Sequence, residues 1–216
     1  MLNTFTTFMP DQRLPPEPFS PARAAAFVIS AITSPFVVTA VTVTLVVMLL
    51  RPAMPQLLLW AGISVVFGAV LPFCFVFWMW RIGRITDVHV GVREQRAWPF
   101  VVALASGAAG VSLLYATGAP PPLVALGGVY LVVGLSLAIV SLQWKISVHS
   151  GVLTAGIISL ALIGYHEAIY ALAFVPAVMW ARRYRGKHTL AQGLVPVIVV
   201  AILTPLAYYC GLAIVG

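Results

Sequence analysis

Long apolar stretches separated by short polar loops dominate the chain. Seven such runs occupy residues 26–50, 55–80, 98–116, 122–143, 148–164, 166–181 and 189–213. A helix needs about 20 apolar residues to cross a bilayer, so the fifth and sixth runs are short for a full crossing. None of the runs alternates with the period of two that half-buried strands show. The pattern predicts an all-α, polytopic integral membrane helical bundle with six to seven transmembrane helices.

Prolines and small residues refine this prediction. Prolines inside the runs predict kinks, which neighbouring helices can accommodate in a membrane, at Pro35, Pro72, Pro176 and Pro205. Small residues cluster at 106–110 and 127–128. Because small side chains let helix backbones approach closely, we expect tight contact between the third and fourth helices.

The first 25 residues differ from the rest of the chain. They contain five prolines and two acids, and no basic segment precedes the first apolar run. This composition predicts an extended, Pro-rich N-terminal arm over residues 1–25 rather than a signal peptide. Residues 26–216 are predicted to form a single transmembrane helical domain.

The composition excludes several classes of protein. Charged residues make up 8% of the chain and hydrophobic residues 62%, with a mean hydropathy of +1.05, so a soluble globule is excluded. The net charge is +7, but no basic helix or aromatic-basic ladder is present to bind nucleic acid. Anionic membrane lipid or phosphate is the better partner class. Cys74 and Cys210 lie inside apolar runs and are expected to pack as small hydrophobes.

Most of the charge falls in three loops, which span residues 81–97, 144–149 and 182–188. Two predicted helices separate each loop from the next, so all three should emerge on one face of the membrane. The opposite face receives Arg51 and the pair His166 and Glu167, which we interpret as an interfacial cap. Within the first loop, Asp87 is expected to neutralise part of the surrounding positive charge; the alternative role is to orient a base.

Tryptophans mark the same face. Five of the six flank the charged loops, as an interfacial belt would, at Trp78, Trp80, Trp98, Trp144 and Trp180. The positive-inside rule then predicts a prokaryotic inner or plasma membrane protein whose charged face is cytoplasmic. Oligomeric state is left open by the sequence.

The three loops together supply the side chains of an anion site. Guanidinium groups suit phosphate oxygens, and imidazole can act as nucleophile or general acid near neutral pH. The candidate residues are His89, Arg93, Arg96, Lys145, Ser147, His149, Arg182 and His188. The alternative interpretation is a set of topological basic loops with interfacial histidines.

The order and spacing of these residues resemble the type-2 phosphatidic acid phosphatases. Residues 181–192 carry an arginine, a tyrosine, a glycine and His188 at the spacing of that family's third motif. The second motif is matched by Ser147 and His149. His89, followed after six residues by Arg96, resembles the first. The chain departs from the family at several motif positions, which are occupied by His89, Ile146, Val148, Ala181 and Gln192 in place of lysine, proline, glycine, serine and aspartate.

The resemblance implies phosphoryl transfer through a phosphohistidine. His188 would attack phosphorus, His149 would protonate the leaving alkoxide, and Gln192 occupies the position that orients the nucleophile. Phosphate oxygens would be held by Arg96, Arg182 and Ser147, with Lys145, His89 and Arg93 completing the substrate-binding set. The substrate class is a phosphatidic acid-like or isoprenyl (di)phosphate, and no metal or other cofactor is required.

Other functions remain to be weighed against this one. Because Gln192 replaces a carboxylate, the chain could instead be a weak or inactive member that binds anionic lipid or supports a membrane complex. Intramembrane prenyl transfer needs aspartate-rich motifs that the five acids do not form. A transporter would carry ionisable groups in mid-helix, and the apolar runs have none near their centres.

Overall fold

The computed structural model describes residues 20–216, and within them every regular element is helical. The α-helices are α1 Pro21–Ile32, α2 Pro35–Leu49, α3 Met54–Val65, α4 Leu71–Arg81, α5 Ala97–Ala116, α6 Pro121–Gln143, α7 Val148–Leu162, α8 Val175–Tyr184 and α9 Leu190–Val215. A π-helical segment, η1 (Val66–Val70), joins α3 to α4, and two 3₁₀ segments, η2 (Arg93–Gln95) and η3 (His166–Phe174), precede α5 and α8. The prediction of an all-α bundle is confirmed for the described residues.

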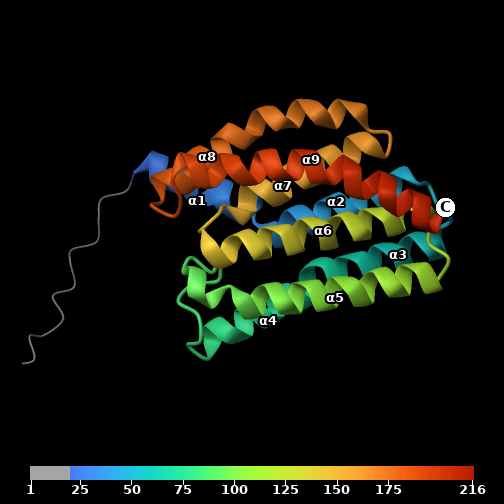
Figure 1. Ribbon diagram of the computed structural model, residues 1–216, viewed down its shortest axis with the longest axis horizontal. Helices are drawn as coiled ribbons and strands as arrows, with labels where there is room; N and C mark the ends of the chain where they lie inside the picture. The colour runs from blue at the N-terminus through green and yellow to red at the C-terminus, as the bar shows by residue number, and fades with distance from the viewer. Residues whose placement is uncertain (1–19) are drawn as a thin grey trace, which may run out of the picture.

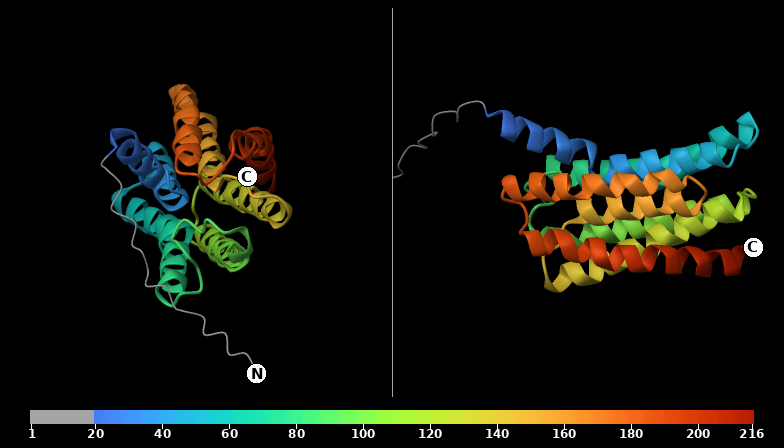
Figure 2. Two further views of the ribbon diagram at one scale, coloured as in Figure 1. Left: turned by 90° about the vertical axis from the view of Figure 1, so that its left-hand side faces the viewer. Right: turned by 90° about the horizontal axis from the view of Figure 1, so that it is seen from above.

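The helices run side by side between two ends of an elongated bundle (Figures 1 and 2). The loops 81–97, 144–149 and 182–188 meet at one end, called here the charged end. They touch one another there: Lys187 Nζ lies 3.1 Å from Asp87 Oδ2, and Arg96 Nη1 donates to the Ile146 carbonyl at 2.9 Å. The C-terminus lies at the opposite, far end (Figure 1). The predicted convergence of the three loops is therefore confirmed.

Four segments are long and apolar enough to cross a membrane: Met54–Arg81, Arg93–Ala116, Pro121–Gln143 and Leu190–Val215. A fifth is obtained if α1 and α2, which meet at a 50° bend, are taken as one crossing. The expected count of six to seven is not confirmed. The reason lies in α7, which has 15 residues, and in the run 166–181, whose first half is wound as η3 before the short α8 begins.

The surface of the bundle is largely apolar. Many large hydrophobic side chains are exposed along the length of the helices, including Phe27, Leu58, Val101, Leu135 and Ile202. An exposed apolar surface of this extent is typical of a protein that faces lipid rather than water. The five tryptophans predicted to flank the charged end are all exposed, whereas Trp60 is buried.

Prolines mark the breaks in the helices. Pro35 opens α2 after the bend, with Ser34 as its N-cap, and Pro72 is the second residue of α4, which follows η1. Pro176 lies in the first turn of α8, while Pro205 is accommodated inside α9. Proline lacks the N–H that an interior helical position would donate, so breaks and wider turns collect where the sequence places it.

The predicted N-terminal arm is wrong at its C-terminal end. Residues 21–25 are not extended, because α1 begins at Pro21. Proline is favoured at the first helical position, where its missing N–H has no intrahelical partner to lose. Residues 1–19 of the predicted arm lie outside the described residues.

The close contact predicted between the third and fourth apolar runs is confirmed between α5 and α6. A Cβ atom added at Gly107 would lie 3.1 Å from the Leu131 side chain, and one added at Gly127 would collide with Val111. Gly110 receives Phe67 of η1 in the same way. Small residues thus let α5 approach both α6 and η1.

Candidate active site

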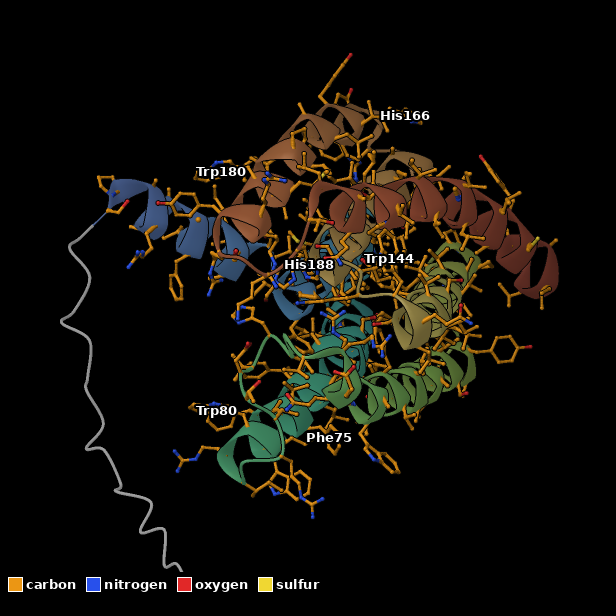
Figure 3. The ribbon with its side chains drawn as sticks, turned by 60° about the vertical axis from the view of Figure 1, so that its left-hand side comes forward. Phe75, Trp80, Trp144, His166, Trp180 and His188 are labelled. Carbon is orange, nitrogen blue, oxygen red and sulfur yellow. The ribbon has the colours of Figure 1, made fainter. Side chains whose placement is uncertain are left out.

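A cavity of about 280 Å³ opens at the charged end, among the three loops and the ends of α2, α4, α5, α7 and α8. Its charged and titratable lining consists of His89, Arg96, His149, Arg182 and His188. These five come from all three predicted loop regions, and Figure 3 shows His188 at the meeting point of the helices. The structure therefore brings together five of the nine residues that the sequence singled out.

Arg96 ties the first loop to the second. Its side chain is 5% exposed. Nε donates to the Val90 carbonyl at 2.9 Å, while Nη1 donates to the Ile146 carbonyl at 2.9 Å and to Ser141 Oγ at 3.3 Å. A guanidinium with several fixed hydrogen bonds is preorganised, so its position does not depend on a bound ligand.

The first loop is held by Asp87. Its Oδ1 accepts from the backbone N–H of His89 at 2.6 Å, and its Oδ2 accepts from Lys187 Nζ at 3.1 Å. Burial alone would raise the pKa of Asp87, but Lys187 and the His89 amide lower it overall. Asp87 thus neutralises part of the cluster, as expected. Val90 follows with φ +46, a strained conformation for a β-branched residue that costs about 1–3 kcal/mol.

The third loop places His188 next to Arg182. Helix α8 ends at Tyr184, with Arg185 as its C-cap. Gly186 follows with a φ of +63, and the N–H groups of Gly186 and Lys187 donate to the Arg183 and Arg182 carbonyls, as at many helix C-termini. The His188 amide also points at the Arg182 carbonyl, at 3.4 Å. Because α9 begins two residues later, His188 is fixed in a tight turn between two helices.

The second loop contributes His149 from the first turn of α7. Ser147 caps this helix, its Oγ accepting from the Ser150 amide at 3.5 Å. His149 is 3% exposed, and its ring stacks on that of His89 with centroids 5.6 Å apart. The backbone N–H of Ser147 donates to the Gln192 carbonyl at 2.8 Å, which connects this loop to α9.

Several buried polar atoms around the cavity have no hydrogen-bond partner among the described residues. They are Arg182 Nε and Nη1, His149 Nε2 and His188 Nδ1. Arg182 is 1% exposed, and Asp87, the nearest acid that affects it, is already paired with Lys187. A buried charge with unused donors is costly unless something pairs with it. The geometry therefore suits an anion.

The same surroundings keep the loop histidines neutral. Burial, followed by the charges of Arg182 and Arg96, lowers the pKa of His188 to about 3. Burial, followed by Arg182, also lowers the pKa of His89. The nearby Gln192 amide raises the pKa of His188 as the smallest of these influences. A neutral imidazole retains a lone pair, which is the form that can act as a nucleophile.

Four predicted site residues do not line the cavity. Arg93 extends away from it, with Nη1 donating to the Gln143 carbonyl at 2.8 Å and Nε to Glu94 at 3.1 Å. Ser147 acts as a helix cap. Lys145 lies outside the lining, although its charge contributes to lowering the pKa of His188.

Gln192 is the fourth predicted site residue that does not line the charged cavity. Its Oε1 accepts from the Thr189 amide at 3.1 Å, and Thr189 Oγ1 accepts from the Gln192 amide at 3.3 Å. This reciprocal pair is a capping box. The Gln192 side chain therefore secures the start of α9. It also raises the pKa of His188 through a side-chain hydrogen bond, although His188 Nδ1 has no hydrogen-bond partner among the described residues.

The rest of the cavity wall is apolar and was not anticipated from the sequence. It includes Phe36, Phe73, Val76 and Phe100. These side chains lie inside long hydrophobic runs, where no spacing separates a cavity wall from ordinary packing. No group of three or more His, Cys, Asp or Glu able to hold a metal ion occurs in residues 20–216.

Comparison with known proteins gives no relative. No protein-family model matches the chain, and neither the curated proteins nor the solved structures contain a significant match.

Proposed function

We propose that the protein is a membrane-embedded lipid phosphate phosphatase or phosphotransferase that works through a phosphohistidine. The observation that carries the proposal is the charged-end cavity, where Arg96 and Arg182 are buried beside three histidines. Phosphoryl transfer asks a protein mainly for positioning and for stabilisation of charge on the phosphoryl oxygens. The guanidinium of Arg96 is held in place by its hydrogen bonds, and the buried guanidinium of Arg182 has donors free for phosphate oxygens.

The reaction would run in two steps. His188, neutral because of its low pKa, attacks phosphorus; a nitrogen–phosphorus bond forms as the bond to the lipid oxygen breaks. Burial, followed by Arg182, lowers the pKa of His149 well below its ordinary value in the free protein. The bound phosphate raises that pKa again, so His149 takes up a proton in the complex and gives it to the leaving alkoxide. Water then attacks phosphorus and gives a proton to His149, and phosphate leaves as the nitrogen–phosphorus bond breaks. Arg96 and Arg182 hold the oxygens throughout.

The proposed substrate is a phosphatidic acid-like or isoprenyl (di)phosphate. The charged cavity lies at the end of an apolar bundle, so a head group could reach the arginines while its tail stays in hydrocarbon. We also propose that six or seven of the apolar runs cross the membrane, the shorter ones within a locally thin part of the bilayer, with the charged end in the cytoplasm.

The test is release of phosphate by the purified protein in detergent without added metal. Phosphatidate, lysophosphatidate and a polyprenyl diphosphate are the substrates. His188→Ala should abolish release, because the nucleophile is lost. His166→Ala should retain the wild-type rate, since His166 lies at the far end (Figure 3). If wild type releases no more phosphate than His188→Ala from any substrate, the enzyme proposal is rejected.

The second candidate function is binding of an anionic lipid without catalysis. It is favoured by Gln192, whose side chain is engaged in the capping box and supplies no carboxylate to His188. In that case sulfate or a lipid phosphate binds at the charged cavity, and Arg182→Lys weakens binding, but no phosphate is released. Measuring both binding and release therefore separates the two functions.

A further inference from the structure

A second cavity of about 170 Å³ lies deeper in the bundle, among α2, η1, α5, α6 and α7. Its lining is apolar apart from a few hydroxyl groups. Five residues line both cavities: Pro35, Phe36, Phe100, Ala103 and Val148. The charged cavity and this inner cavity therefore adjoin, with single side chains between them.

The inner cavity is bounded by the tight contacts that small residues make between helices, since a Cβ atom added at Gly107 or Gly134 would lie 3.1 or 3.3 Å from a leucine side chain of the facing helix. Gly107, Gly110, Gly127 and Gly134 all line it, from the facing sides of α5 and α6. Beyond them the cavity is bounded by Leu114 and Leu123, which belong to a buried hydrophobic cluster. The inner cavity therefore extends from the charged cavity, which Arg96 and Arg182 line, to the hydrophobic cluster that contains Leu114 and Leu123.

The charged cavity also has an apolar side wall next to the lipid-facing surface. Phe36 of α2 and Phe73 of α4 both line it, with ring centroids 5.4 Å apart in an edge-to-face arrangement. Phe73 is 42% exposed, so this aromatic pair lies between the cavity and the outer surface of α4. A hydrocarbon chain in the bilayer would meet this pair before the buried arginines.

We propose that the inner cavity holds one hydrocarbon tail of the lipid phosphate whose head group occupies the charged cavity. The two cavities adjoin at Ala103. A hydrocarbon chain attached to a phosphate at Arg96 and Arg182 would therefore pass Ala103 and enter the inner cavity. This inference rests on the proposed function for its head-group site. It goes further by making tail length, set by the depth of the inner cavity, a determinant of the substrate.

The test measures binding of alkylphosphonates of increasing chain length at a constant detergent concentration. These compounds cannot be hydrolysed at their carbon–phosphorus bond, so binding is read independently of catalysis. In the wild-type protein, affinity calculated from the concentration of free compound in water, after correction for the share in micelles, should rise about fourfold with each added methylene, until the cavity is full. Beyond that length the affinity should level off.

Ala103→Phe should fill the passage between the cavities and end the rise at a shorter chain. Because Ala103 also lines the charged cavity, circular dichroism checks that the variant is folded, and affinity for sulfate, which has no tail, is measured beside it. The inference is supported by the shorter chain-length limit and not by the absolute affinity. Leucine is smaller than phenylalanine, so Ala103→Leu should shorten the chain length at which affinity levels off by less than Ala103→Phe does. Ala105→Phe is the matched control, because Ala105 is exposed on the same helix and lines neither cavity.

The inference is overturned if affinity does not depend on chain length, or if Ala103→Phe and Ala105→Phe behave alike. Its failure is distinguishable from failure of the proposed function. Phosphate release with a flat chain-length dependence would retain the phosphatase and reject the tail site. A steep dependence that Ala103→Phe shortens, with no release from any substrate, would retain the tail site and reject catalysis.

Discussion

The charge of Arg182 is buried with two of its donor nitrogens unpaired. We predict that Arg182→Lys weakens sulfate binding at least about tenfold, because an ammonium cannot reproduce the guanidinium fork and a charged hydrogen bond contributes about 1.5–3 kcal/mol. Arg183→Lys is the control, since Arg183 is the exposed neighbour on the same helix. Isothermal titration of the purified protein measures both. Equal affinities of the two variants would contradict an anion site at Arg182.

The low pKa of His188 gives anion binding a pH dependence. The pKa is about 3 in the free protein, and a bound anion raises it by stabilising the imidazolium. At a pH between these two values the complex carries more protons than the free protein, so affinity rises as pH falls. We expect tighter sulfate binding and proton uptake as the pH is lowered from about 6.5, the ordinary pKa of a histidine, towards the value of about 3 in the free protein.

His188→Gln should make this pH dependence shallower, and titration in buffers of different ionisation enthalpy measures the proton uptake. Some dependence should remain, because burial and Arg182 also lower the pKa of His89. Sulfate affinity that falls on acidification, or an unchanged slope in His188→Gln, would assign the effect to other groups.

The sequence predicted some residues of the candidate site and missed the role of others. His89, His149 and His188 could be grouped because the loops that carry them share one face, and charged residues are rare enough to stand out. The actual role of Gln192 was readable too, since Thr189 followed after two residues by a Gln is a capping-box spacing. Arg93 could not be separated from Arg96, because both are basic and in one loop, and only the fold shows which one is buried.

Among the helical elements, the π-helical segment η1 lies between α3 and α4 and also binds α5. Pro72 lacks an N–H, and η1 is the wider turn that precedes it. The Phe67 carbonyl in this segment accepts a hydrogen bond from Ser106 Oγ of α5 at 2.7 Å. An interhelical bond of this kind contributes about 0.6 kcal/mol on average in a membrane protein.

We predict that Ser106→Ala destabilises the bundle by about that amount, roughly 0.6 kcal/mol. Ser112→Ala should be close to neutral, because Ser112 Oγ donates only to the Ala108 carbonyl of its own helix at 2.9 Å. Unfolding in mixed micelles, followed by circular dichroism, compares the two. A larger loss for Ser112→Ala than for Ser106→Ala would contradict a role for this bond in holding α5 to η1.

Helix positions were more predictable than helix type. The apolar runs locate α5, α6 and α9 to within a few residues, because each is bounded by proline, glycine or charge. The run 166–181 gave no sign that its first half forms η3, since apolar residues are equally compatible with either winding. The bend between α1 and α2 follows from Pro35, whereas the start of α1 at Pro21 was hidden among prolines that indicated an extended arm.

At the scale of the whole molecule, the two ends of the bundle differ in charge. The loops that meet at the charged end contain Arg81, Arg84, Lys145 and the bases of residues 182–188. At the far end, the loop between α2 and α3 contains Arg51, and η3 begins with His166, labelled in Figure 3, and Glu167. Basic residues in short loops are retained on the cytoplasmic side. The charged end, and with it the candidate site, is therefore expected to face the cytoplasm.

Cysteine accessibility tests this orientation. Cys74 and Cys210 are free and exposed, so both are first replaced by serine. Thr86 and Thr117 are exposed at opposite ends of the bundle, which makes Thr86→Cys and Thr117→Cys a matched pair. In intact cells a membrane-impermeant maleimide should label Thr117→Cys, and Thr86→Cys should react only after permeabilisation. The reverse pattern would place the phosphate site outside and require a substrate in the outer leaflet.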